Sequence, residues 1–379
     1  MTTSRPQLDT PTTTSTGRTG LAQPWLGLAG SLVVVAYWAV VMLAPGPQRM
    51  LEITGAWSIF ALPVLGVLAL WWNGWPVARW HPAAAGTVLT LATIVGGAAA
   101  CLLGQGVVGR FDPTHLFGTP DEAALGHLVS FPFTAPLAAC VFVVFLQLTF
   151  VCRKWPLDRL GPVAGGIAVF AASWVLGTAA YYLLATWDPT VPTPARTALG
   201  LHNPIGAVNA LDLMAILLCI AAWQMVVFFL LDGHPVAKLR STPAYLVAAN
   251  TTTLAGGVLT WIVLHTLAGQ PGTRIGELCA VIITGTLVTG LLFERWPARR
   301  ATRDALRRWA LLTTTAVVAA VTGIALHTIG TATESWTREP VELWVTVSAL
   351  NFLSAGVIIH CVLWRRWPFP TVPDPDTPR

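Results

Sequence analysis

Histidine and aspartate recur at matched positions in two segments of this sequence, and together they could bind a metal ion. One segment holds Asp112 and then His127, and a second holds Asp188 and then His202 in the same order. Imidazole and carboxylate groups together bind transition metals. If the segments pack around a common axis, we expect a metal site, with copper or iron as examples. Its candidate ligands are His127, His202, His265, His327, Asp112 and Asp188.

A structural role explains the same residues. Both aspartates stand in Asp-Pro-Thr, where the Asp side chain can bond the backbone two residues on and favour a turn. The histidines are expected near helix ends, where the ring can rest at the lipid–water interface. No His-x-x-x-His or Glu-x-x-His pair occurs, so the ligands of a metal would have to come from different helices. The sequence leaves both alternatives open.

A second set of polar residues lies in or beside apolar runs, where ionisable side chains are costly and are functional candidates by default. Asp212 is expected about a turn and a half inside the apolar segment 206–231. It can bind a proton, a cation or an amine, or it can pair with Arg196. Amide side chains can line a polar cavity beside it. The predicted substrate-binding residues are Asp212, Asn203, Asn209, Gln224, Asn250 and Asn351.

Composition indicates a protein that positions these residues inside a membrane. Hydrophobic residues make up 54% of the 379 residues and charged residues only 10%, against about 25% charged in soluble domains. The 18 tryptophans suit a lipid–water boundary. The net charge of +5 is spread over short loops, so we expect the lipid bilayer as a partner and no nucleic acid.

Ten apolar segments are long enough to cross a bilayer, and we predict an all-α, polytopic membrane helix bundle. The segments are 25–45, 54–73, 83–107, 124–152, 161–186, 206–231, 243–267, 275–294, 307–330 and 341–364. Five of them end in a short turn with an aromatic residue before proline, four times Trp-Pro and once His-Pro. The turns are Asn73–Pro76, Arg153–Pro156, Asp232–Pro235, Glu294–Pro297 and Arg365–Pro368.

The basic residues predict the orientation. Of the 22 Lys and Arg residues, only Arg49, Arg110, Arg196, Arg274 and Arg338 fall on the side opposite these turns. The positive-inside rule then places the turns and both termini in the cytoplasm, with the protein in the plasma (inner) membrane. Residues 1–23, rich in Thr, Ser and Pro, and the Pro-rich residues 367–379 are predicted to be disordered cytoplasmic tails.

Internal repeats are expected in the ten-helix region 24–366. Residues 111–127 resemble 187–202, and 264–277 resemble 326–342 in residue order and spacing. Duplication of a helical hairpin explains both. Hairpin repeats are common in transporters, where binding sites form between repeats.

The sequence narrows the function without fixing it. It contains no Walker A loop, GxSxG elbow, HExxH motif or C-x-x-C-H motif. We expect a permease-type transporter of a small molecule or cation, with a polar His/Asp site near the outer face. The alternatives are a membrane-embedded metalloenzyme or redox protein with outer histidine ligands, and an accessory subunit that binds a membrane-protein partner. Assembly into a homo-oligomer is a further alternative. The sequence does not decide whether the protein is an enzyme.

Overall fold

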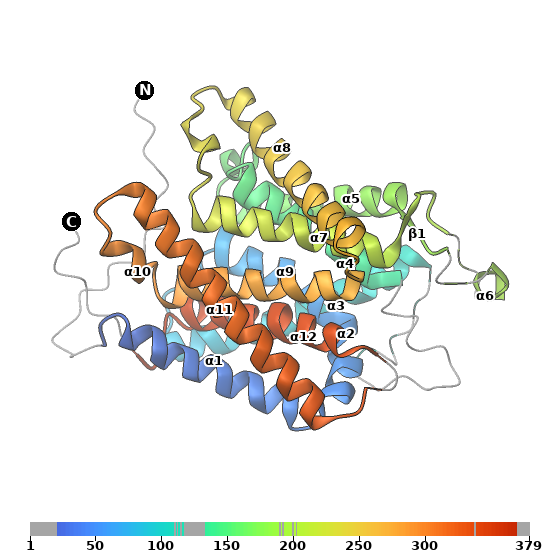
Figure 1. Cartoon of the computed structure of the whole chain (residues 1–379), viewed down its shortest axis with the longest axis horizontal. Coiled ribbons are helices and arrows are strands. Elements are labelled where there is room, and N and C mark those ends of the chain that lie inside the picture. Colours follow the sequence, from blue (N-terminus) through green and yellow to red (C-terminus); the bar gives the residue numbers. More distant parts are fainter. Residues whose placement is uncertain are drawn as a thin grey trace.

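The computed structural model describes residues 21–109, 111, 113, 116, 133–188, 191, 193–198, 201, 203–336 and 339–369. Nearly all regular structure in this part is helical (Figure 1). The α-helices are α1 (Trp25–Leu43), α2 (Pro47–Gly66), α3 (Pro82–Val108), α4 (Ala135–Leu146), α5 (Pro162–Leu184), α6 (Thr193–Ala198), α7 (Ala210–Trp223), α8 (Thr242–Trp261), α9 (Gly272–Leu287), α10 (Trp296–Arg299), α11 (Asp304–Thr333), α12 (Val341–Val347) and α13 (Ala355–Ile358).

Several of these helices continue as π-helical segments, in which each backbone N–H bonds the carbonyl five residues back instead of four. These segments are η1 (Val67–Trp71), η6 (Gln147–Val151), η8 (Gln224–Leu230), η10 (Ile262–Leu267), η11 (Val288–Leu292), η12 (Ser348–Ser354) and η13 (Ile359–Leu363). Two short 3₁₀ helices, η7 (Leu157–Leu160) and η9 (Val236–Lys238), lie in connections. The strands β1 (Ala185–Thr186) and β2 (Val208–Asn209) form a two-residue parallel pair, which the all-α prediction did not include.

Five central helices form a closed ring. They are α2–η1, α4–η6, α7–η8, α9–η11 and the last helix, Val341–Leu363, which runs from α12 to η13. Each packs against the next in this order, and the last helix packs back against α2. Three of these helices, which start at Ala210, Gly272 and Val341, are 72% buried over their most apolar stretch. Figure 1 shows α7 and α9 in the middle of the bundle, with β1 and α6 at the opposite end from α10.

Five peripheral helices cover the ring. α3 packs on α2, α5 on α4, α8 on α7, α11 on α9, and α1 on the last helix. Three of these contacts bring glycine against the backbone of a central helix: a Cβ on Gly97, Gly177 or Gly257 would lie 2.7–2.9 Å from the Cα atom of Ala61, Val141 or Ile220. Small residues allow this close packing in lipid.

The five turns share one backbone geometry. At the end of each central helix an N–H bonds the carbonyl five residues back, and the N–H two residues later bonds the carbonyl six residues back, at 2.8–3.1 Å. The first two residues of every turn have φ between 47° and 80°. Left-handed backbone costs a non-glycine residue about 1–2 kcal/mol. The second turn position is glycine in two turns, Gly74 and Gly233, and basic in the other three.

The basic residues at this position join neighbouring central helices. Lys154 Nζ donates to Leu70 O at 2.5 Å, and Arg295 Nη2 donates to Phe229 O at 2.6 Å. Arg366 Nη2 donates to Leu291 O at 2.6 Å. Each side chain therefore caps free carbonyls at the end of the preceding helix, where a cation is favoured by the helix dipole. The turns lie together at one end of the bundle, which we call the turn end.

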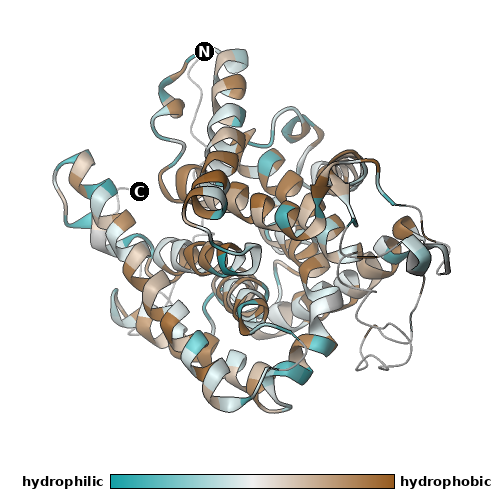
Figure 2. Ribbon diagram, turned by 45° about the vertical axis from the view of Figure 1, so that its right-hand side comes forward, coloured by the Kyte–Doolittle hydropathy of each residue, from teal (hydrophilic) through white to brown (hydrophobic). Residues whose placement is uncertain are grey.

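The membrane prediction is confirmed at the level of helices. Among the described residues, eight helices are long and apolar enough to span a bilayer, and α2 with η1 forms a ninth candidate with a 61° bend. The predicted span 124–152 corresponds to a shorter apolar helix, Ala135–Val151, and its first residues, up to 132, lie outside the described part. Figure 2 shows hydrophobic residues along the helices and hydrophilic ones concentrated in connections. Most of 1–23, of 111–127 and of 367–379 also lies outside the described residues, so the tails and the first repeat stay predictions.

Candidate functional site

A chain of three side-chain amides crosses the packed helices α4–η6, α7–η8 and α8. Gln224 Nε2 donates to Gln147 Oε1 at 2.5 Å, and Gln147 Nε2 donates to Asn250 Oδ1 at 2.8 Å. Asn250 Nδ2 donates in turn to Leu246 O at 2.7 Å. Thr253 of α8 joins the chain, because it accepts a bond from Gln147 Nε2 at 3.0 Å. We call these four side chains, Gln147, Gln224, Asn250 and Thr253, the amide chain.

The amide chain ends in a buried acceptor. The orientation of the Gln224 amide is set by two acceptors facing its Nε2: Gln147 Oε1, and Val143 O at 3.1 Å. Its Oε1 is left buried, and within the described part of the chain it has no hydrogen-bond partner. The three amide dipoles point the same way and polarise one another, which makes the last oxygen a stronger acceptor. An unpaired buried acceptor costs about 1–3 kcal/mol, which a donor from a bound molecule would offset.

The side chains of the amide chain and their hydrogen-bond partners carry no charge. Its members and their hydrogen-bond partners are amides, a hydroxyl, backbone carbonyls and the Cys152 thiol, 3.9 Å from Asn250 Nδ2. No carboxylate takes part in these bonds. A cation brought to Gln224 Oε1 would lose its hydration without gaining a counter-charge, which is unfavourable in a low-dielectric interior. The site therefore suits an uncharged molecule that donates a hydrogen bond.

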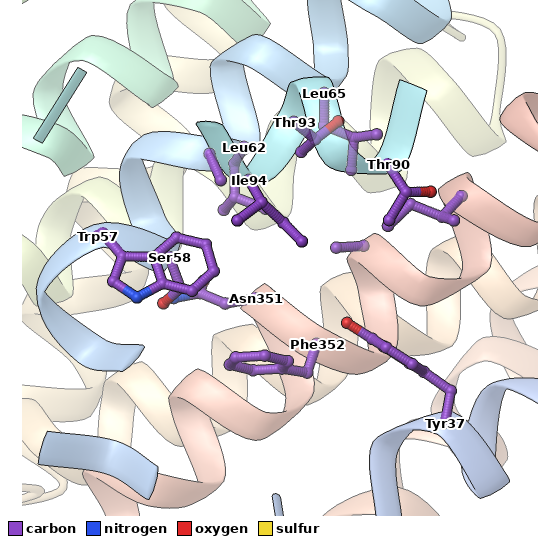
Figure 3. A pocket seen from close by; sticks show the side chains of 13 residues that line it. Tyr37, Trp57, Ser58, Leu62, Leu65, Thr90, Thr93, Ile94, Asn351 and Phe352 are labelled. Atoms are coloured by element: carbon purple, nitrogen blue, oxygen red, sulfur yellow. The ribbon is translucent and has the colours of Figure 1, made fainter. Parts of the chain in front are cut away.

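A cleft lies on the other side of the ring, between α1, α2, α3 and the last helix (Figure 3). The cleft is shallow and open on one side. Asn351 Nδ2 donates to Ser58 Oγ at 2.8 Å on its wall. Tyr37 points its hydroxyl into the cleft from α1 in Figure 3. The remaining lining is mostly apolar and includes Trp57 and Phe352.

An ion cluster lies where α9 begins. Glu277 is only 3% exposed and forms an ion pair with Arg274, one turn earlier on the same helix. His327 of α11 brings Nδ1 to 3.4 Å from Glu277 Oε1. Glu277 is the sixth residue of α9, beyond its first turn, so the helix dipole alone does not account for its charge.

The predicted residues Asn203 and Asn209 have structural partners. Asn203 accepts a bond from Trp187 N at 2.8 Å and donates to Asp188 Oδ2 at 3.0 Å. Asn209 caps α7, because its Oδ1 accepts from Leu211 N at 2.9 Å, and its Nδ2 donates to Asp188 O at 3.2 Å. These bonds hold the β1–β2 pair at the start of α7, so both amides are explained without a substrate.

Asp212 lies closer to the helix end than predicted. Because Asn209 caps the helix, α7 begins at Ala210, and Asp212 is in its first turn rather than a turn and a half inside. A carboxylate is stabilised there by the helix dipole. The side chain is half-buried and faces the start of α9: a Cβ placed on Gly272 would lie 3.7 Å from its Oδ1. The side chain of Arg196, its predicted partner, is outside the described part.

The metal hypothesis is tested only in part. His127, His202 and Asp112 lie outside the described residues. His265 stacks on Trp261, with ring centroids 4.9 Å apart, and its Nδ1 is 3.0 Å from Gln270 O. Within the described ranges no three His, Cys, Asp or Glu residues are grouped so as to hold a metal. The six cysteines are all free.

Sequence reasoning selected Gln224, Asn250 and Asn351 but missed the residues that join or face them. Gln147 connects the first two, and Ser58 and Tyr37 complete the cleft. A signal for Gln147 was present, since it is a lone amide in a long apolar run. Comparisons with protein families, with curated proteins and with solved structures gave no match. The function therefore has to be inferred from these sites alone.

Proposed function

We propose that this chain is a permease-type transporter of a small, uncharged solute that donates hydrogen bonds, with Gln224 at its binding site. The observation that carries the proposal is the buried, unpaired Oε1 of Gln224 at the end of the amide chain. Transporter sites commonly lie within the membrane between helices, near interruptions of regular helix. Gln147 and Gln224 both stand at the point where an α-helix passes into a π-helical segment. Such segments are frequent at functional sites.

The orientation follows from charge. The positive-inside bias supports a cytoplasmic turn end, and with it cytoplasmic termini in a plasma membrane. Gln224 would then lie in the inner half of the bilayer, close to the end of η8. Asp212 starts the same helix at the opposite end, about 18 Å away along the axis. Asp212 would face the solute at the outer entrance, while Gln224 binds it further in.

Solute flux into proteoliposomes tests the proposal. Stopped-flow light scattering would follow the entry of glycerol, urea and erythritol into vesicles with wild-type protein, a Gln224→Leu variant or no protein. We expect wild type to exceed empty vesicles for at least one solute. Gln224→Leu should reduce that flux about tenfold, the effect of one neutral hydrogen bond.

The control is Gln105→Leu, which makes the same change in a fully buried glutamine of α3 that is outside the amide chain. Its flux should stay near wild type. Flux that survives in Gln224→Leu, or wild-type flux equal to that of empty vesicles for all three solutes, would contradict the proposal.

A further inference from the structure

The cleft opens sideways toward lipid. Its rim residues Tyr37 on α1 and Ile94 on α3 are 41% and 37% exposed. Neighbouring apolar side chains on the same two helices, Val40 and Val95, are 70% and 68% exposed. Both helices are membrane-spanning candidates, so their exposed apolar faces contact acyl chains. A molecule dissolved in the bilayer can therefore reach the cleft without passing through water.

Inside the cleft the polar groups are uncharged, and several are free to bind. The hydroxyls of Thr90 and Thr93 already donate to backbone carbonyls of their own helix, at 2.7 and 2.8 Å. Ser58 Oγ accepts from Asn351, which leaves its hydrogen available. Asn351 Oδ1 and the Tyr37 hydroxyl make no hydrogen bond among the described residues. The cleft thus offers two hydroxyl donors and one amide acceptor, and no ionisable carboxylate or amine lines it.

The depth of these groups excludes ordinary lipids. Asn351 lies about half-way along the candidate span Val341–Leu363, and Ser58 is hydrogen-bonded to it at 2.8 Å. Both groups are therefore near the middle of the bilayer. A phospholipid keeps its charged head at the membrane surface, and an acyl chain alone would leave the three polar groups unpaired at a cost. The occupant needs a small, uncharged polar head that can sit deep in lipid.

We propose that the cleft binds a lipid-soluble molecule with an uncharged, oxygen-bearing head group and an apolar tail, which is the chemistry of an isoprenoid quinone. Head-group oxygens would accept bonds from Tyr37 and Ser58, and Asn351 Oδ1 would accept from a reduced hydroxyl form. The head ring would lie against Trp57 and Phe352, and the tail would leave between Tyr37 and Ile94. This site is separate from the amide chain and does not depend on the solute proposal.

Equilibrium dialysis of detergent-purified protein with a benzoquinone carrying one isoprene unit tests the assignment. Ile94→Trp fills the mouth of the cleft, whereas Val95→Trp places the same ring on the adjacent, lipid-facing position. We expect saturable binding to wild type, affinity reduced about tenfold or more in Ile94→Trp, and affinity within about twofold of wild type in Val95→Trp. Asn351→Leu, which removes the amide and keeps the side-chain size, should also lose about tenfold.

Three results would overturn the proposal: no saturable binding to wild type, equal binding by Ile94→Trp and Val95→Trp, or displacement of the quinone by a short-chain anionic phospholipid in wild type but not in Ile94→Trp. Gel filtration would verify that each variant is folded. If Ile94→Trp does not fold, Ser58→Ala with Asn351→Leu replaces it, and unchanged affinity in that double variant counts against the proposal.

Discussion

Glu277 is a buried carboxylate whose charge is balanced by neighbours that are more exposed. Its side chain is 4% exposed, against 38% for Arg274 and 36% for His327. Removing one partner of a buried ion pair leaves an uncompensated charge, which typically costs 3–5 kcal/mol. The contact with His327 compensates only when that ring is protonated. Arg274 is thus expected to be needed for stability as long as Glu277 carries its charge.

Arg274→Ala should therefore destabilise the protein by roughly 3 kcal/mol, the lower end of that range, because Arg274 is itself partly solvated. Glu277→Gln removes the buried charge together with its need for a partner, and should cost only about 1 kcal/mol. Unfolding in mixed micelles, followed by tryptophan fluorescence, gives both free energies. Arg307→Ala is the control: its pair with Asp304 spans 3.9 Å between exposed side chains and should contribute under about 1 kcal/mol. A smaller effect for Arg274→Ala than for Glu277→Gln would contradict this account.

The sequence shows which residue types could form the candidate site, but not the direction in which each side chain points from its helix. Gln224, Asn250 and Asn351 stand out as amides in apolar runs. Whether two of them meet depends on how each helix is rotated about its axis. A π-helical segment changes which of the following residues lie on a given face of the helix. Gln147 and Gln224 both open such segments, so ideal helical periodicity would misplace the residues after them. Asp212 was misplaced for a related reason, since the Asn209 cap delays the start of α7.

At the scale of elements, three of the five central helices contact their peripheral partners in the same way. The contact point has the same position in all three helices. It lies six residues before the carbonyl that accepts the first wide hydrogen bond of the turn: Ala61 before Val67, Val141 before Gln147, and Ile220 before Val226. The predicted Trp-Pro and His-Pro turns end the central helices as expected. Duplication of one hairpin stays a prediction. A duplicated hairpin would repeat the contact position in this way. The pairing of hairpins into a closed ring was beyond the sequence, because a list of spans carries no order in space.

Gly177→Ala and Gly257→Ala should loosen these contacts. A Cβ at either position would lie 2.7 Å from backbone atoms of the facing helix, which cannot move aside alone. We expect each substitution to lower the free energy of unfolding by about 1–3 kcal/mol, the usual cost of overpacking. Gly106→Ala on α3 is the matched control: nothing lies within 4 Å of its new Cβ, and alanine favours helix by up to about 1 kcal/mol. Unfolding midpoints in the same micelles would separate the two groups, and equal midpoints would show that the glycines are not contact points.

The basic side chains of the turn end form a second link between elements. Burial lowers the pKa of Lys154, and the nearby Asp158 partly opposes this shift. Arg366 bonds Leu291 O and also Glu294, at 2.9 Å. Arg366→Ala should cost about 1.5–3 kcal/mol, the range for hydrogen bonds to charged groups. Arg159→Ala, an exposed basic residue at the same end, should change stability by less than about 0.5 kcal/mol. Thermal unfolding compares them, and similar midpoints would mean that helix capping here contributes little.

For the whole molecule, the ring places all five turns at one end, and the orientation of that end decides which compartment the candidate sites face. The sequence predicts it from the charge bias alone, since only five of the 22 basic residues fall outside the turn end and the tails. Moving a cluster of Lys and Arg across the bilayer is unfavourable, which is the basis of the positive-inside rule. A cytoplasmic turn end would put the amide chain near the cytoplasm and the Arg274–Glu277–His327 cluster near the outer face.

Labelling of introduced cysteines in intact cells measures this orientation. Arg159→Cys lies at the turn end and Ala268→Cys in the connection between α8 and α9 at the opposite end, and both positions are exposed. The native cysteines are buried or half-buried, so wild type gives a low background. We expect a membrane-impermeant maleimide to label Ala268→Cys directly and Arg159→Cys only after permeabilisation. The reverse pattern would invert the protein and place the amide chain at the outer face. Labelling of both in intact cells would mean that these two ends do not lie on opposite sides of the bilayer, which is incompatible with a ring of spanning helices.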